Sequence, residues 1–322
     1  MKLGVLTNLY GQLSLEDTLK KCKALGIQGA EIGCGGYPGK AHCDPEKLLA
    51  DKQAMDAFVA LFQTYDVELM AFACHVNPVH PNKKIAQAGD REIRNAILLA
   101  EKVGVDTIVT FSGCPGGCPE DQTPNWATCA WPTDFLQVLD YQWNEVLIPY
   151  WRNLGEYALS HGVMKIAFEM HPGFCVYNPE TLLKLRAAVG NVIGANFDPS
   201  HLIWQGIDPA MAIRELKGAI YHVHAKDTQL NTFNISRNGV LDTKQYTEEN
   251  DRSWIFRTVG YGNGEDYWRG MISAFRLAGY DKVMSIEHED SLMTVDEGLE
   301  KAVAFLKPLL ISQPKPGSIS WA

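Results

Sequence analysis

The segment KIAFEMHPGF, Lys165 to Phe174, combines the pattern of a buried strand with two ionisable side chains. Ile166, Phe168 and Met170 recur at every second position, as on a strand face that packs against helices. Glu169 and His171 alternate with them and are therefore expected on the opposite face. Because burying an unpaired charge is costly, these two side chains predict a function at the end of this strand.

Seven further short apolar runs recur along the chain, and amphipathic segments separate them. The eight predicted strands are KLGVLTN (from Lys2), GAEIGCG (from Gly29), VELMAFACH (from Val67), DTIVTFSG (from Asp106), KIAFEMH (from Lys165), IGANFDP (from Ile193), AIYHVHAKD (from Ala219) and KVMSIEHED (from Lys282). Several of the segments between them begin at Ser, Asp or Asn and end at Gly, as capped helices do. Eight such units predict an α/β fold, a parallel (β/α)8 TIM barrel over residues 1–311 with a C-terminal tail at 312–322.

Two connections are longer than ordinary barrel loops. One runs from Cys114 to about Asp140 after the fourth strand, and the other from about Thr228 to Gly264 after the seventh. Loops that follow strands lie on the face where barrel enzymes place their active sites, so both are expected to be functional. Trp126 and Trp131 in the first loop could hold a sugar or a flat aglycone as substrate-binding residues, or could simply anchor the loop.

Four polar side chains stand at the ends of the fifth to eighth predicted strands. Strand alternation turns all of them toward the barrel axis, and they are Glu169, Asp198, His224 and Glu287. Three carboxylates and an imidazole in one pocket would repel one another without a cation. Mixed oxygen and nitrogen donors without thiolate favour one divalent ion, Mn²⁺ first and Mg²⁺ or Co²⁺ next, over structural zinc.

Further candidates surround this predicted centre. His171 follows Glu169 on the same face and could be a general base, or a histidine that only hydrogen-bonds a neighbour. His75 and His201 are predicted to contact substrate. Lys226 and Asp227 could bind a substrate hydroxyl or orient His224, or could form a plain ion pair, and Glu31 could be no more than a charge at the rim.

Composition excludes several other classes of protein. A net charge of −9 and the absence of Lys/Arg-rich runs argue against a nucleic-acid partner. No uncharged run approaches the roughly 18 residues of a membrane helix, and no signal peptide is recognisable, so a cytoplasmic location is expected. The 8 scattered cysteines are expected to be reduced, and Cys114 and Cys118 form their only close pair.

The motifs FEMHP, NFDPSH, HVHAKD and SIEHED resemble the xylose isomerase-like barrel superfamily of sugar isomerases and epimerases. This resemblance covers essentially the whole chain. It implies one divalent ion, usually Mn²⁺, on Glu169, Asp198, His224 and Glu287, with His201 at the substrate. It also implies that the metal-bound Glu169 and Glu287 can act as acid and base.

Ketose 3-epimerases of this superfamily carry an arginine six residues after the histidine ligand, where this chain has Leu230. The segments TFSGCPG, PNWATCAWPTDF and DPSHLIWQGIDP look more like the catalytic subunits of C-glycoside deglycosidases. That resemblance implies a lyase acting on 3-oxo-glycosides, with a small β-sandwich subunit as partner. A homo-oligomer that binds a small sugar or glycoside is the other expectation.

All these reactions begin by removing a proton from the carbon beside a sugar carbonyl. His171 is the predicted base of the lyase reaction, and an epimerase or isomerase is the alternative. A phosphodiesterase resembling endonuclease IV would need more histidines and a basic surface. A sugar-binding protein without catalysis would not need the predicted ligand set.

Overall fold

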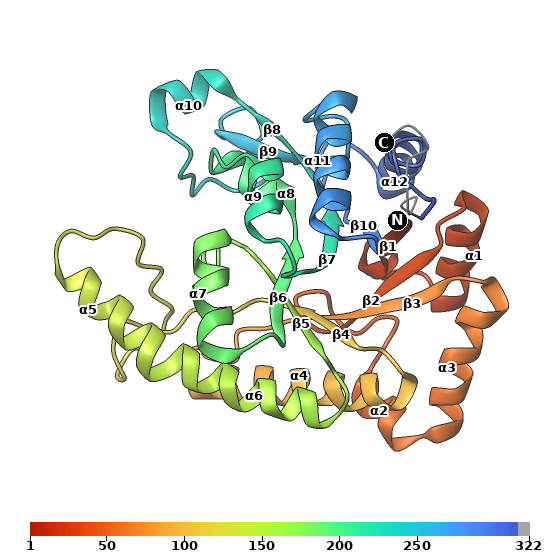
Figure 1. Cartoon of the computed structure of the whole chain (residues 1–322), viewed down its shortest axis with the longest axis horizontal. Helices are drawn as coiled ribbons and strands as arrows, with labels where there is room; N and C mark the ends of the chain where they lie inside the picture. Colours follow the sequence, from red (N-terminus) through yellow and green to blue (C-terminus); the bar gives the residue numbers. More distant parts are fainter. Residues whose placement is uncertain (315–322) are drawn as a thin grey trace, which may run out of the picture.

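The computed structural model describes residues 1–314, and in it eight parallel strands close into a barrel (Figure 1). In barrel order the strands are β1 (Lys2–Leu6), β10 (Val283–Ile286), β7 (Ile220–Ala225), β6 (Ile193–Phe197), β5 (Lys165–Glu169), β4 (Thr107–Thr110), β3 (Glu68–His75) and β2 (Gly29–Gly36). All eight predicted strands and the barrel are confirmed. Most of the predicted tail, residues 315–322, lies outside the described residues.

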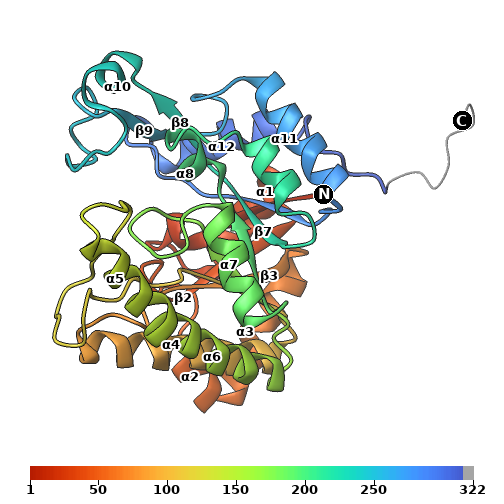
Figure 2. The ribbon, with the colours of Figure 1, turned by 60° about the vertical axis from the view of Figure 1, so that its left-hand side comes forward.

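Helices surround the barrel and connect its strands (Figures 1 and 2). They are α1 (Leu15–Leu25), α2 (Pro45–Ala50), α3 (Lys52–Tyr65), α4 (Lys83–Val103), α6 (Ile148–Ser160), α7 (Pro179–Val189), α8 (Pro199–Trp204), α9 (Pro209–Glu215), α11 (Glu265–Ala278) and α12 (Val295–Leu306), with a 3-10 turn η1 (Thr7–Tyr10). Their ends follow the capping signals of the sequence. Asn178, for example, caps α7 through a hydrogen bond from the main-chain N–H of Thr181. Among residues 1–314, every helix is too short or too polar to cross a bilayer.

The strand faces alternate as the sequence predicts. Ile166 and Phe168 of β5 pack in the large apolar core between the barrel and its helices. Ala167, which alternates with them, packs in a separate small cluster with Ala71 and Val109. The interior of the barrel is therefore filled by small side chains, and the polar side chains follow them toward the carboxyl ends of the strands.

The long connection after β7 is not the irregular loop that the sequence suggested. It holds an antiparallel pair of strands, β8 (Asp227–Leu230) and β9 (Trp254–Arg257), and the helix α10 (Thr232–Asn238). Figure 1 shows this insertion standing away from the barrel above α8 and α9. The β8 segment, DTQL, lacks the apolar run by which the barrel strands were predicted, and its partner β9 follows only after α10, which explains the error.

The connection after β4 becomes helical earlier than its sequence indicated. The helix α5 (Asp134–Asp140) continues through a π-helical turn η2 (Tyr141–Leu147) into α6. Figure 2 shows α5 at the outer end of this long helical segment. The irregular part of the connection is therefore limited to the residues between β4 and α5.

Candidate metal centre

The four predicted ligands come together at the carboxyl ends of β5, β6, β7 and β10, which are neighbours in the barrel. Glu169 ends β5, Asp198 directly follows β6, His224 lies in β7, and Glu287 directly follows β10. One donor atom from each residue lies within 4.8 Å of the others. This convergence arises because parallel strands end at one face of the barrel.

The donor atoms of this group are enclosed but poorly satisfied. His224 Nδ1 lies 3.2 Å from Oε2 of Glu287 and 3.3 Å from Oε2 of Glu169. Within residues 1–314, His224 Nδ1, Asp198 Oδ2 and Glu287 Oε2 are buried without a hydrogen-bond partner. Buried polar atoms rarely remain unpaired, so three of them pointing at one space fit a cation. Oxygen and nitrogen donors of this kind suit a divalent ion.

A lysine and two histidines surround the group. Lys226 Nζ lies 2.7 Å from Oε2 of Glu287 and 3.0 Å from Oδ2 of Asp198, in both cases outside hydrogen-bond geometry. His201 Nε2 and His75 Nε2 lie 2.9 Å and 3.2 Å from the two carboxylate oxygens of Glu169. Lys226, His201 and His75 therefore lie next to the predicted ligands.

Neighbouring histidines and Lys226 keep Glu169 and Glu287 ionised despite their burial. Burial alone would raise the pKa of Glu169, but hydrogen bonds with His201 and His75 and the nearby His224 and Lys226 hold it well below its usual range. Burial opposes ionisation of Glu287 too, yet the charges of Lys226 and His224 lower its pKa to about 2. The pKa of Lys226 is raised well above its ordinary value because Asp198 and Glu287 outweigh its burial. Glu169 and Glu287 are therefore ionised carboxylates beside a fixed ammonium.

A cavity of about 110 Å³ opens beside these residues. Its walls are Asn8, Tyr37, Pro38, His75, Phe111, Glu169, His171, His201, Lys226, Glu287 and Glu289. Sites for drug-sized ligands usually measure about 300–1,000 Å³. The volume and the polar walls fit a small hydroxylated molecule.

His171 lies in this cavity, beside Glu169 as predicted. Its Nδ1 is 2.5 Å from the carbonyl oxygen of Pro172, to which it donates, so Nε2 carries the lone pair. Burial, and next the charge of His201, lower the pKa of His171 to about 3. The ring is therefore neutral and can accept a hydrogen bond, but it is a weak base.

Asp227 is not among the residues that line the cavity, and its hydrogen bonds lie away from His224. Its carboxylate accepts hydrogen bonds from the main-chain N–H groups of Gly260, Gly262 and Asn263, at 3.0, 3.1 and 2.9 Å. It also accepts from the side chains of Asn263 and Trp268. Asp227 thus anchors the return loop of the insertion, with its oxygens already occupied.

The two tryptophans of the first long connection lie away from the metal group. Trp131 is 80% exposed. Trp126 lines a different cavity of about 480 Å³ and donates its Nε1–H to the carbonyl of Phe174, at 3.0 Å. Because that hydrogen bond ties the loop to the segment after β5, the anchoring interpretation describes Trp126 better.

Glu31 is more than a rim charge. It is 1% exposed and accepts hydrogen bonds from His222 and His224 inside the barrel. Strand alternation predicts that all three side chains point inward. Strand alternation does not show how far a side chain from β2 reaches toward β7, so the contact of Glu31 with His222 and His224 could not be predicted.

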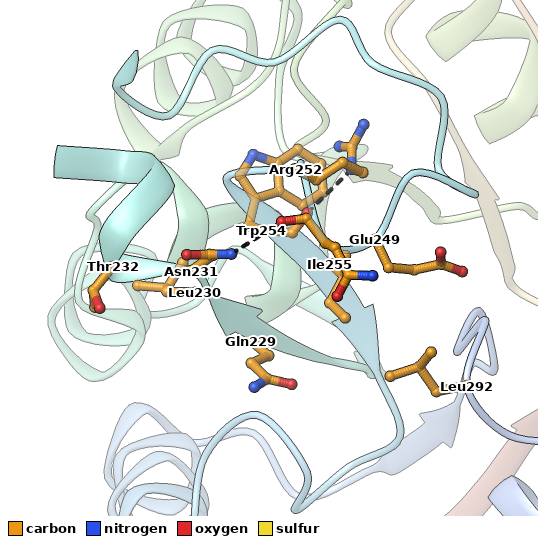
Figure 3. A pocket seen from close by; sticks show the side chains of 10 residues that line it. Gln229, Leu230, Asn231, Thr232, Glu249, Arg252, Trp254, Ile255 and Leu292 are labelled. Atoms are coloured by element: carbon orange, nitrogen blue, oxygen red, sulfur yellow. Dashed lines mark hydrogen bonds between the residues drawn. The ribbon is translucent and has the colours of Figure 1, made fainter. Parts of the chain in front are cut away.

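Another cavity, of about 430 Å³, lies on the insertion. Figure 3 shows Leu230 and Ile255 on its wall, which strands β8 and β9 build. Arg252 is buried there between the rings of Tyr246 and Trp254, and its Nε donates to the main-chain carbonyl of Trp254. Every group of potential metal ligands in residues 1–314 lies elsewhere, so the candidate site is the smaller cavity on the barrel.

Comparisons with known proteins agree with this architecture. Over 310 residues the chain is 38% identical to the uncharacterised protein YfiH of Bacillus subtilis, covering 95% of this chain and 98% of YfiH. The crystal structure of a D-tagatose 3-epimerase-like protein is similar with a TM-score of 0.62 and 22% identity, covering 96% of this chain and 98% of that one. The IOLI protein with a bound zinc atom matches with a TM-score of 0.65 and 19% identity, over 96% of each chain. Since the model of the xylose isomerase-like TIM barrel also matches residues 19–309, the chain belongs to that family.

Proposed function

We propose that the protein is a sugar isomerase or epimerase that depends on one divalent cation. The carrying observation is the group of four donor atoms, within 4.8 Å of one another, beside a small polar cavity. The residues that would hold the ion are Glu169, Asp198, His224 and Glu287. The zinc atom in the related IOLI fold supports a divalent ion, and the oxygen-rich donor set makes Mn²⁺ the first candidate.

When bound, the cation supplies Lewis-acid stabilisation of the negative charge that develops as a carbon beside a carbonyl loses its proton. Glu169 and Glu287 line the cavity from different strands, and the low pKa of each keeps it ionised, with oxygen lone pairs free of protons. Two such carboxylates suit epimerisation, since one can remove the proton and the other can return it to the opposite face. Lys226 adds a fixed positive charge to the same wall.

His171 has a different role in this proposal. Epimerisation needs two proton-transfer groups, which the glutamates supply from two different strands and His171 alone does not. Its neutral Nε2 suits a hydrogen bond from a substrate hydroxyl. We therefore assign proton transfer to the two glutamates instead of His171, the base predicted from the sequence.

The cavity also favours an uncharged sugar. Among the described residues that line it, Lys226 is the only lysine or arginine. Asp198, Glu287 and Glu289 already surround its ammonium within 3.0 Å. A sugar phosphate would find no free cation in this wall, so free ketoses are the proposed substrates.

Deuterium exchange tests this function directly. The Mn²⁺-loaded protein is incubated in D₂O with a panel of ketoses, and proton NMR follows loss of the proton beside the carbonyl together with any new isomer. Exchange that EDTA abolishes, and that E169Q and E287Q reduce by at least ~10²-fold, is expected. The same panel with ketose 1-phosphates tests the preference for free sugars. No exchange with any sugar by the loaded protein would contradict the proposal.

A lyase of the C-glycoside deglycosidase type is the second candidate, favoured by one contact. Phe111 lines the metal cavity and stacks on Phe174 at 4.2 Å, and the carbonyl of Phe174 holds Trp126 of the larger, aromatic cavity. A 3-oxo-glycoside could place its sugar in the first cavity and its aglycone in the second. Release of a chromophoric aglycone, with and without a small β-sandwich partner subunit, would distinguish this reaction from isomerisation.

A further inference from the structure

A buried carboxylate lies inside the barrel below the proposed metal centre. Glu31, on β2, is 1% exposed. An ionised carboxylate without partners would be strongly unfavourable there, so its surroundings must supply them.

The partners of Glu31 come from strands on the far side of β1. Its Oε2 lies 2.8 Å from His222 Nε2, 2.9 Å from His224 Nε2 and 2.9 Å from Ser285 Oγ, and its Oε1 lies 3.1 Å from His224 Nε2. In the barrel order, β1 and β10 separate β2 from β7. The Glu31 side chain therefore spans the interior to reach the metal-binding strand.

This contact determines which nitrogen of His224 is available to a cation. An ionised carboxylate only accepts, so Nε2 of His224 must keep its proton to donate to Glu31. The other nitrogen, Nδ1, faces Glu169 and Glu287 and has no hydrogen-bond partner within the described part of the chain. Only Nδ1 can then lose its proton to a metal ion.

We propose that Glu31 is the positioning residue of the metal centre: its hydrogen bond fixes the ring of His224 with Nε2 protonated and Nδ1 aimed at the cation. This inference rests on the proposed function, since it assumes a metal on His224. Carboxylates behind metal-binding histidines typically account for a 10–100-fold difference in metal affinity. Ser285 also donates a hydrogen bond to Glu31, but it is not one of the potential metal ligands. Its removal should therefore leave the bond between Glu31 and His224 in place, which makes S285A a matched control.

A competing interpretation places a second ion between Glu31, His222 and His224, whose donor atoms also lie within 4.8 Å of one another. That ion would have to replace both hydrogen bonds from the Nε2 atoms. The two interpretations differ in metal stoichiometry, one ion per chain against two, and in the nitrogen of His224 that binds the first ion.

The first test is Mn²⁺ binding by calorimetry to the wild type, E31Q and S285A, with circular dichroism to verify folding. One ion per wild-type chain, a 10–100-fold weaker dissociation constant for E31Q and a change below about 3-fold for S285A are expected. Equal affinity of folded E31Q and wild type would overturn the role of Glu31 while leaving the metal centre intact. Two ions per wild-type chain would overturn it in favour of the second site. Absence of Mn²⁺ binding by the wild type would overturn the proposed function itself.

A second measurement does not use E31Q and therefore applies even if that variant does not fold. The chain has 9 histidines, so selective ¹⁵N-histidine labelling gives few signals. Long-range ¹H–¹⁵N spectra of the Zn²⁺-loaded protein should show one ring with a protonated Nε2 and a metal-bound Nδ1, absent from an H224Q sample. Metal on Nε2 of His224 would overturn the inference.

Discussion

Nζ of Lys226 lies 2.7 Å from Oε2 of Glu287, one of the proposed metal ligands. It lies 3.0 Å from Oδ2 of Asp198, a second ligand, and donates a hydrogen bond of 2.9 Å to Glu289. The ammonium therefore repels a divalent cation from the same oxygens that would bind it. It also forms part of the cavity wall, so Lys226 should oppose metal binding while assisting the reaction.

Replacing Lys226 with Met should separate these two effects. The Mn²⁺ dissociation constant of K226M is expected to stay the same or decrease, because one positive charge beside the ligands disappears. Turnover should fall by about 10²–10³-fold, the usual loss when a fixed group stabilising developing charge is removed. Calorimetry measures the first quantity and deuterium wash-in the second.

Lys301→Met is the control for this variant, since Lys301 pairs with Glu297 on the surface of α12 and should leave both quantities unchanged. Weaker Mn²⁺ binding by K226M would contradict the prediction. It would mean that Lys226 supports the ligand arrangement rather than competing with the ion.

Removal of the metal should lower the stability of the protein. Without a cation, Glu169, Asp198 and Glu287 face one another in a buried group with unpaired oxygen atoms. Mn²⁺ at 100 times its dissociation constant should stabilise the native state by about 2.7 kcal/mol. Thermal unfolding with EDTA, and with Mn²⁺ titrated back, measures this effect.

The variant D198N serves as the control for that titration, since it lacks one ligand charge and should respond much less to Mn²⁺. A wild-type melting temperature that does not change between EDTA and excess Mn²⁺ would exclude a metal bound to the native state. Mg²⁺ and Co²⁺ in parallel titrations would rank the metals.

Much of the site could be predicted from the sequence, because the alternation of side chains along a strand depends only on neighbouring residues. The faces of β5 follow directly from Ile166 and Phe168, and the inward positions of Glu169 and His171 follow from them. The same rule turns His222, His224 and Lys226 inward and Asp227 to the opposite face, which agrees with the hydrogen bonds of Asp227 outside the cavity.

Other features depend on contacts that a linear pattern cannot contain. The reach of Glu31 across the interior to His224 joins residues 193 positions apart. The hairpin of β8 and β9 depends on pairing across the intervening α10. Trp126 is held by a hydrogen bond to the main-chain carbonyl of Phe174. Every residue has such a carbonyl, so the sequence does not indicate which one the tryptophan binds.

Asp227 gives a prediction that distinguishes a structural from a substrate-binding role. The variant D227N places an amide where three main-chain N–H groups converge, and should lower the free energy of unfolding by about 2–3 kcal/mol. Urea unfolding measures the loss, and Asp251→Asn on the exposed part of the insertion should be nearly neutral. A stable D227N with a raised KM would restore the substrate-binding interpretation.

The acid dependence of stability should be traceable to Asp242 in the insertion. Burial would raise the pKa of Asp242, but hydrogen bonds from Lys244 and the N–H of Ser253 lower it to about 2. A carboxylate with a lower pKa in the folded state stabilises the protein above its unfolded pKa of about 3.9, and loses this contribution as the pH falls toward 2. D242N should therefore be less stable by about 2 kcal/mol between pH 5 and 7, and the difference from wild type should shrink below pH 4. Urea unfolding at pH 7, 5, 4 and 3.5, with D251N alongside, measures it; a difference that stays constant down to pH 3.5 would show that packing, not charge, sets the role of Asp242.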